Sequence, residues 1–314
     1  MRFGRIATPE GMCFCVIEGD GADTMCKEIV GHPFGDPEYT GKQWPLADVR
    51  LLAPMLPSKI VAIGRNYADH VAEVFKKSAE SLPPTLFIKP PTAVIGPGAA
   101  IKIPDFATNV EFEGELALVI GRACKNVKAE DWKTVVRGYT IINDVSSRDL
   151  QFSDGQWARA KGMDTFAPLG PWIETNLDAI DLGNLPIKAH LTHDGTTETK
   201  QDSNSTQMIM SVGEIIEYIT ASMTLLPGDI VSTGSPAGTA PMVPGDYIEI
   251  EIPGIGRLGN PVERAYPLRR SLCRIGTTLE RQPQRCPDQG SSGPGRRRCS
   301  GCGSRGRCRC RVAG

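Results

Sequence analysis

The chain has 314 residues, of which 40% are hydrophobic, with 35 Lys+Arg against 36 Asp+Glu. This length holds one large or two modest domains and is enough to bury a substantial core. The balanced charge hides two unlike regions, because residues 266–314 contain 12 arginines, no lysine and only two acidic residues. Residues 1–265 are therefore acidic overall, which argues against a nucleic-acid-binding surface on them.

The cysteines and the apolar runs indicate neither a disulfide-stabilised protein nor a membrane protein. Four of the ten cysteines lie in residues 1–265, without regular spacing, and a chain with a core of this size needs no disulfide staples. No secretory hydrophobic segment follows the first residues, and the longest apolar runs, such as residues 116–120, fall far short of the roughly 20 residues that span a bilayer. We therefore expect a cytoplasmic protein without a membrane segment.

The predicted elements in chain order begin with short strands separated by turns. Residues 1–54 are expected to form a small N-terminal β domain, which a proline-flanked segment at 51–57 separates from a second domain at 55–265. A buried strand at 59–64 leads into a helix from 68 to 81, stopped by Pro83 and Pro84. Further strands are predicted at 85–89, 116–120, 139–142 and 230–233.

A second helix is predicted after residue 210. Ser211 and Glu214 form an S-x-x-E capping box. Apolar residues then recur at i, i+3, i+4 and i+7, at positions 212, 215, 216 and 219. Two clear helices among many short strands, with 34 Gly and 25 Pro, favour a β-rich α+β fold over a doubly wound sheet.

Residues 266–314 are different in kind. They combine arginine, glycine, serine and cysteine with almost no apolar periodicity, so we expect them to be disordered. Arginine without lysine is also what GC-rich coding sequence gives when it is read out of frame, and we interpret this segment as a possible frameshifted terminus. The alternative is a tail that binds RNA or DNA through phosphate contacts, although no aromatic residue follows Tyr266.

Alternating acids mark the start of the strand at 116–120. On a strand, Glu111, Glu113 and Glu115 point to one face, and no Lys or Arg lies between residues 110 and 120 to pair with them. Asp144 closes the strand at 139–142. One interpretation is a solvated strand edge. The other is a site for a hard cation such as Mg²⁺ or Mn²⁺, which can hold a bidentate 2-oxo acid and stabilise a developing enolate.

A second candidate group lies on the first predicted helix. His70 and Glu73 are at i, i+3 and share a helix face. This arrangement is typical of a general base that a carboxylate holds in one tautomer. A surface histidine with a casual acidic neighbour gives the same pattern.

Three other motifs are interpreted as decoys. Residues 254–259 satisfy G-x-G-x-x-G, but no helix follows them, so a turn between strands is expected. His190 and His193 have H-x-x-H spacing but lie on opposite faces of a predicted strand. The tail cysteines lack the spacing of a zinc site. No G-x-S-x-G or Walker A sequence occurs.

Five motifs together resemble the fumarylacetoacetate hydrolase superfamily. They are residues 64–70 (GRNYADH), 113–116 (EGEL), 143–151 (NDVSSRDLQ), 161–171 (KGMDTFAPLGP) and 233–239 (TGSPAGT). The similarity covers about residues 56–265 in order, and it is greatest to the bacterial branch that includes actinobacterial oxaloacetate decarboxylases and acylpyruvase-type members. Residues 1–54 resemble the small N-terminal domain of that branch.

The resemblance implies a fold, a cofactor and a set of site residues. It implies a mixed β-roll catalytic domain, a homodimer, and Mg²⁺ or Mn²⁺ bound by Glu113, Glu115 and Asp144, with Glu111 left outside. It assigns catalysis to His70 and Glu73, on a helix that closes over the substrate, and to Lys161. Weaker or pocket-lining positions match at Arg65, Gln151, Thr233 and Gly234.

The resemblance also limits the reaction. It implies metal-dependent cleavage of a C–C bond in a short 2-oxo acid through a metal-stabilised pyruvate enolate, as in oxaloacetate decarboxylation or acylpyruvate hydrolysis. The alternative within the family is 2-hydroxyhepta-2,4-diene-1,7-dioate isomerase or 5-oxopent-3-ene-1,2,5-tricarboxylate decarboxylase activity in aromatic catabolism. One scaffold serves all of these reactions, so membership specifies the site better than the substrate.

Overall fold

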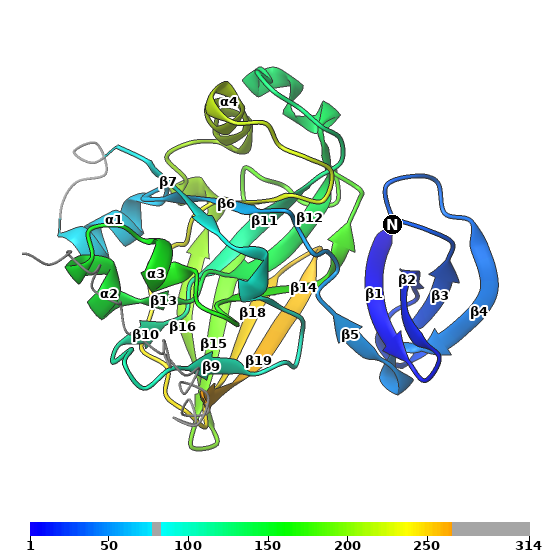
Figure 1. The fold of residues 1–314 in the computed structure, drawn as a ribbon, viewed down its shortest axis with the longest axis horizontal. Helices are drawn as coiled ribbons and strands as arrows, with labels where there is room; N and C mark the ends of the chain where they lie inside the picture. The colour runs from blue at the N-terminus through cyan, green and yellow to red at the C-terminus, as the bar shows by residue number, and fades with distance from the viewer. Residues whose placement is uncertain (77–82, 266–314) are drawn as a thin grey trace, which may run out of the picture. The chain divides into compact units, whose positions relative to one another are not determined.

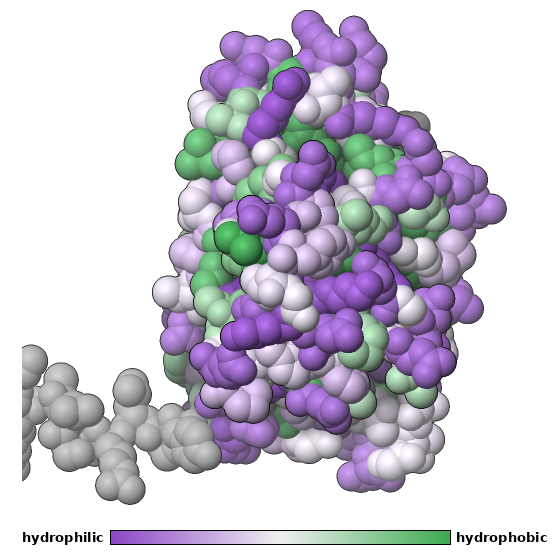
Figure 2. Space-filling view, turned by 90° about the vertical axis from the view of Figure 1, so that its right-hand side faces the viewer, coloured by the Kyte–Doolittle hydropathy of each residue, from purple (hydrophilic) through white to green (hydrophobic). Residues whose placement is uncertain are grey.

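The N-terminal segment folds as an antiparallel meander (Figure 1). The computed structural model describes residues 1–76 and 83–265. The meander consists of β1 (Arg2–Thr8), β2 (Gly11–Glu18), β3 (Met25–Ile29) and β4 (Tyr39–Pro45), and β5 (Arg50–Leu52) pairs with β1. β1 and β2 bury side chains in two separate clusters: Phe3 and Val16 belong to one, and Ile6, Cys15 and Ile17 belong to the other. Figure 2 shows hydrophilic side chains over most of the face in view, with small apolar patches among them.

The main sheet joins this meander to the strands of the larger region. Its order is β4-β3-β2-β1-β14-β12-β11-β17-β6-β7. The added strands are β6 (Ile60–Gly64), β7 (Thr85–Lys89), β8 (Val94–Ile95), β11 (Gly114–Ile120), β12 (Val136–Asn143), β14 (Ala167–Glu174) and β17 (Ile230–Ser232). The pair β17–β6 is parallel, whereas β11 and β12 form an antiparallel pair at the centre.

A second sheet supplies the other half of the core. Its order is β16-β15-β18-β19-β9, with bounds β9 (Ile101–Ile103), β15 (Pro186–His193), β16 (Thr196–Asn204), β18 (Tyr247–Ile252) and β19 (Gly256–Arg264). Leu116 and Leu118 of β11 share one buried cluster with Ala189 of β15 and Ile250 of β18. The apolar faces of the two sheets therefore bury each other, which is the dominant favourable contribution to folding.

Helices and one small ribbon complete the fold. The helices are α1 (Ala68–Phe75), α2 (Arg148–Ser153), α3 (Ala158–Lys161) and α4 (Val212–Ser222), and β10 (Val110–Glu111) pairs with β13 (Ser146–Ser147). Figure 1 shows α1, α2 and α3 gathered at one end of the sheets. The capping box at Ser211 and Glu214 is present as predicted. Within the part of the chain that is described, no helix is long and apolar enough to cross a membrane.

The strand-rich α+β architecture is confirmed, with two local differences from the sequence analysis. Helix α1 ends at Phe75, because Lys76 adopts a left-handed conformation with φ 54°, and the rest of the predicted helix 68–81 lies largely outside the described residues. The expected strand through residues 111–115 is interrupted at 112 and 113. The predicted tail at 266–314 lies outside the described residues. The G-x-G-x-x-G residues lie at a turn between strands, as expected: residues 253–255 connect β18 to β19, and residues 256–259 begin β19.

Candidate metal centre and active site

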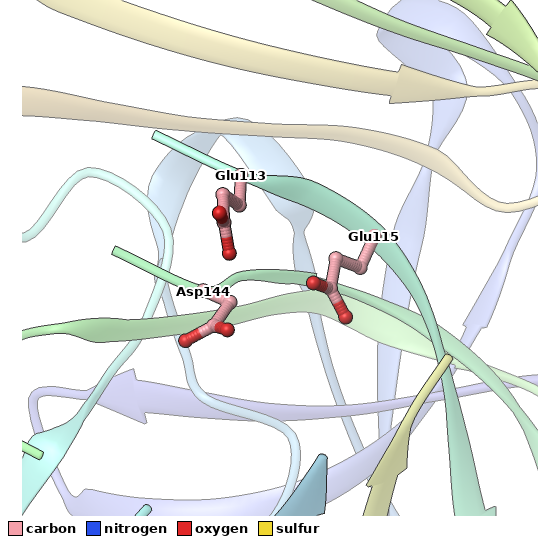
Figure 3. A group of neighbouring side chains, drawn as sticks. All are labelled: Glu113, Glu115 and Asp144. Carbon is pink, nitrogen blue, oxygen red and sulfur yellow. The ribbon is translucent and has the colours of Figure 1, made fainter. Parts of the chain in front are cut away.

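Three carboxylates converge where β11 begins and β12 ends. Gly114 pairs with Asn143 in the ladder, which brings Glu113 and Glu115 close to Asp144. One ligand oxygen from each lies within 4.8 Å of the others, and all three residues are buried. Figure 3 shows the three side chains pointing toward a common centre. Among residues 1–76 and 83–265, no other group of His, Cys, Asp and Glu side chains meets this geometry.

Cations from distant segments surround the three carboxylates. Lys161 Nζ lies 2.6 Å from Glu113 Oε2 and 2.6 Å from Asp144 Oδ2, and Lys89 donates to the other oxygen of Asp144. Arg148 lies 2.6 Å from Glu113 and also binds Glu111, at 2.8 Å. The local sequence offered Glu111, Glu113 and Glu115 no partner, and these cations come from β7, α2 and α3.

The surrounding charges divide the carboxylates into two kinds. Burial raises the pKa of Glu113, but the positive charges of Arg148 and Lys161 outweigh it and hold the pKa well below its usual range. Burial, followed by the negative charges of Asp144 and Glu113, raises the pKa of Glu115 well above its usual range. Glu115 is therefore an acid whose charge the protein compensates poorly.

This donor set fits a divalent metal ion. The centre offers carboxylate oxygens without histidine or cysteine, which is the preference of Mg²⁺ and Mn²⁺. Burial, followed by the negative charges of Asp144 and Glu113, disfavours the ionised form of Glu115 and raises its pKa, and a dication there would stabilise that ionised form. Glu113, Glu115 and Asp144 are the residues that would hold it.

His70 borders the carboxylates, and Glu73 lies beside it on α1. His70 Nε2 is 3.6 Å from Glu113 Oε1, and its Nδ1 is 3.9 Å from Glu73 Oε2. Glu73 instead accepts a hydrogen bond from the backbone N–H of Gly238, at 2.9 Å. His70 Nδ1 is buried, and no residue in the described part of the chain hydrogen-bonds to it. Helical spacing correctly predicted a shared face, but the two side chains are not in hydrogen-bond contact.

A small cavity of about 20 Å³ connects these groups, with room for about one water-sized particle. Arg65, Gln151 and Trp157 line it together with His70, Lys161 and the three carboxylates. Trp157 packs edge-on against Phe87, with ring centroids 5.3 Å apart, and the Arg65 guanidinium lies over its ring at 5.5 Å. Gln151 accepts a hydrogen bond from Arg148, at 2.8 Å.

The loop after β17 contributes through its backbone and Ser235. Gly234 N donates to Glu115 Oε2 at 2.9 Å. The hydroxyl of Thr233 donates to the carbonyl oxygen of Leu116, at 2.9 Å, and Ser235 rather than Thr233 lines the cavity. The residue composition of the loop gave no signal for this difference.

The H-x-x-H pair lies outside the centre. His190 contacts Thr199 and Glu251. His193 contacts Asp246 near the tip of the β15–β16 hairpin, at 2.6 Å. Their separate partners agree with the prediction that they occupy opposite strand faces.

Comparison with known proteins places this geometry in a family. Residues 59–263 match the family model described as fumarylacetoacetate (FAA) hydrolase C-terminal, and residues 1–54 match the model Rv2993c-like, N-terminal. The chain is 34% identical over 265 residues to oxaloacetate tautomerase YisK of Bacillus subtilis, covering 81% of this chain and 87% of the relative.

Solved structures agree in fold. A crystal structure of Cg1458 with inhibitor superposes with a TM-score of 0.83 at 77% identity, covering 84% of this chain and all of that one. Maleylpyruvate hydrolase from Sphingobium sp. SYK-6, in complex with manganese(II) and pyruvate, gives a TM-score of 0.68 at 31% identity, covering 85% of this chain and all of the other. With the motifs, the carboxylate centre and these matches together, the chain belongs to the fumarylacetoacetate hydrolase family.

Proposed function

We propose that this protein is a divalent-metal-dependent enzyme that cleaves a C–C bond in a short 2-oxo acid, by oxaloacetate decarboxylation, acylpyruvate hydrolysis or both. The observation that carries this proposal is the convergence of Glu113, Glu115 and Asp144 in one cavity with Lys161 and His70. The related maleylpyruvate hydrolase, whose structure contains manganese(II) and pyruvate, supports both the metal and the substrate class.

The side chains divide the chemistry between them. A Mg²⁺ or Mn²⁺ ion held by Glu113, Glu115 and Asp144 would supply Lewis acidity at the 2-oxo group. Lys161 Nζ, which contacts Glu113 and Asp144, is proposed to donate to the carboxylate of the substrate, adding positive charge where negative charge develops. Arg65 and Gln151 line the same cavity and are proposed to orient the remaining substrate oxygens.

His70 is the proposed proton-transfer group. When the bond from C3 of oxaloacetate to the far carboxylate breaks, carbon dioxide leaves, the electron pair stays at C3, and the protonated imidazole of His70 gives a proton from Nε2 to C3. For an acylpyruvate, His70 Nε2 instead takes a proton from the water that attacks the distal carbonyl. The bond between that carbonyl carbon and C3 then breaks, a carboxylic acid leaves, and the proton passes from Nε2 to C3 of the pyruvate enolate. Glu73 stabilises the protonated imidazole once its carboxylate leaves the Gly238 N–H and turns to Nδ1.

Tautomerisation is a second candidate reaction, which the name of the relative YisK favours. It transfers a proton between C3 and the 2-oxo oxygen without breaking a C–C bond, so it needs the same Lys161 and His70. Isomerisation of a hydroxy-diene dioate is the corresponding proton shift on a longer substrate. These reactions differ in the group that is attached to C3 of the substrate. Lys161 and His70 serve all of them and do not specify that group.

The family resemblance supports proposals about organisation as well. We propose a small N-terminal domain at 1–54, a catalytic domain at 55–265, and a cytoplasmic homodimer with no nucleic-acid partner. Gel filtration with light scattering tests the dimer, and a truncation after Ala265 that keeps full turnover would show that residues 266–314 are dispensable for catalysis.

A substrate panel tests the proposed function. The protein is stripped with a chelator, reconstituted with Mg²⁺ or Mn²⁺, and incubated with oxaloacetate, acetylpyruvate, maleylpyruvate and the hydroxy-diene dioate. Pyruvate release and keto–enol exchange are measured separately, beside an Asp144→Asn variant. We expect metal-dependent pyruvate release that the variant lacks. No metal-dependent turnover of any substrate would overturn the proposal, and exchange without pyruvate release would favour the tautomerase.

A further inference from the structure

The interruption between β10 and β11 leaves backbone N–H groups exposed to a buried, charged centre. Glu113 lies outside both strands, and Gly114 begins β11. A buried N–H without a partner costs free energy, so side chains must take over from the ladder. Asn143 accepts from the N–H of Glu113, and Gln201 accepts from that of Gly114, each at 2.9 Å.

Gln201 is an unusual residue for its strand. β16 is the edge of its sheet and most of its residues are exposed, yet the side chain of Gln201 is completely buried. The register shifts between Ala189 and His190, so that Lys200 is an extra residue in β16. A β-bulge of this kind redirects the side chains that follow it, and here it turns Gln201 inward from an otherwise polar edge.

The amide nitrogen of Gln201 binds the loop that follows β17, at residues 233–239. Nε2 donates to Ser235 Oγ at 2.9 Å and to the carbonyl oxygen of Pro236 at 2.8 Å. The same loop carries Gly234, whose N–H binds Glu115. The side chain of Gln201 therefore links two segments. One is the backbone at Gly114, between Glu113 and Glu115, and the other is the loop whose Gly234 N–H binds Glu115.

Close packing leaves this link little room to shift. A Cβ at Gly114 would lie 3.0 Å from Gln201 Oε1, and a Cβ at Gly238 would lie 2.1 Å from the carbonyl oxygen of Lys200. The approach at Gly238 is to backbone and requires glycine, whereas a side chain at Gly114 would press directly on the amide of Gln201. Gln201 thus connects three segments: the bulge of β16 on which it lies, the start of β11, and the loop 233–239.

We propose that Gln201 is a positioning residue for the metal centre: it sets the backbone at Gly114 and the loop at 235–236 so that Glu113 and Glu115 converge. It touches neither the cavity nor the carboxylates, and acts through the groups that carry them. This inference rests on the proposed metal-dependent function. Outer partners of metal ligands typically contribute about 10- to 100-fold to metal affinity.

The test compares two isosteric substitutions of buried amides. Gln201→Met removes the three hydrogen bonds without changing the length of the side chain. Asn260→Leu is the matched control, because Asn260 is also buried and its amide donates to two backbone carbonyls, of Gly96 and Ala99, away from the centre. Mn²⁺ affinity is measured by titration calorimetry, and hydrogen exchange of the metal-free proteins by mass spectrometry.

We expect Gln201→Met to weaken Mn²⁺ binding about 10-fold or more and to speed exchange at residues 113–116 and 233–239. Asn260→Leu is expected to lose thermal stability without either change. Unchanged affinity and exchange in Gln201→Met, or an equal loss of affinity in both variants, would overturn the inference. Failure of the wild-type protein to bind Mn²⁺ would instead overturn the proposed function.

If Gln201→Met does not fold, the wild-type protein still decides the question. Mn²⁺ addition should slow exchange in three segments together, at residues 113–116, 199–203 and 233–239, and leave 257–261 unchanged. Slowing at the first and third segments without the second would overturn the role of Gln201.

Discussion

Two buried carboxylates lie at opposite ends of β17, and the protein treats them differently. Asp229, just before the strand, accepts hydrogen bonds from Ser58 Oγ at 2.6 Å, from the N–H of Lys59 at 3.2 Å and from the N–H of Leu226 at 2.8 Å. The ammonium of Lys59 pairs with it as well. Three hydrogen bonds and one ion pair therefore compensate the negative charge of Asp229, as expected of an acid with a structural role.

Glu115, near the other end of β17, accepts fewer hydrogen bonds and lies beside two other carboxylates. It accepts from Ser232 Oγ and from Gly234 N, while burial and then the negative charges of Asp144 and Glu113 raise its pKa. The two sites are equally buried, so burial alone does not identify a functional acid. The uncompensated charge does, because it gives a dication something to stabilise.

The largest effect is expected from neutralising Glu115. In Glu115→Gln, metal-dependent turnover should fall on the order of 10³-fold, or about 4 kcal/mol at the transition state. The metal-free protein should become more heat-stable, because burial and the charges of Asp144 and Glu113 raise the pKa of Glu115 in the folded state, and an amide carries no charge for them to penalise. Turnover with and without metal and the melting temperature of the stripped protein measure both effects. A lower melting temperature would contradict the reading of Glu115 as uncompensated.

Truncating Asp229 should have the opposite profile. Asp229→Ala leaves the Lys59 charge and two backbone N–H groups without their partner, and we expect a loss of about 3–5 kcal/mol in the free energy of unfolding. Chemical denaturation of the metal-free protein measures this loss. Mn²⁺ affinity of the folded fraction should stay within about 3-fold of the wild-type value. A larger loss of Mn²⁺ affinity in Asp229→Ala would show that the two ends of β17 are not independent.

A smaller change should follow removal of His70, which borders the acid cluster but is not among its three ligand groups. His70→Asn is expected to lower kcat about 100-fold, as for loss of a proton-transfer group, and to leave Mn²⁺ affinity nearly unchanged. Glu73→Gln is the milder partner variant, because Glu73 is 3.9 Å from the imidazole. Steady-state kinetics and metal titration separate the two quantities. Loss of Mn²⁺ affinity without loss of kcat would assign His70 to the metal.

Sequence patterns grouped the carboxylates but did not select among them. Period-2 alternation put Glu111, Glu113 and Glu115 on one face, although the strand is interrupted at 112 and 113 in the structure. Only the family resemblance chose Glu113 and Glu115 with Asp144. The capping box at Ser211 likewise predicted a helix that the structure contains. These signals are local, because each depends on residues a few positions apart.

Local sequence patterns could not predict the cations that pair with the carboxylates. Lys89 and Arg148 reach the cluster from β7 and α2, and only the strand order brings them there. Helices α2 and α3 have six and four residues, too few for a helical period to be visible. Gln201 stands in a polar run, and its burial depends on a bulge that the composition does not show.

Asp149 extends the comparison to a third carboxylate, which is partly exposed. Burial raises its pKa, but hydrogen bonds from Ser147 and Thr108 outweigh this and lower the pKa to about 2 from 3.8. A depressed carboxyl pKa stabilises the fold above pH 3.8, and that contribution is lost as the pH falls toward 2. Asp149→Asn should therefore lower the free energy of unfolding by ~1 kcal/mol at neutral pH, discounted for solvent screening. The difference between variant and wild type should shrink toward zero between about pH 4 and pH 2, in denaturation series across that range. A difference that does not change with pH would mean that Asp149 acts through packing rather than through its charge.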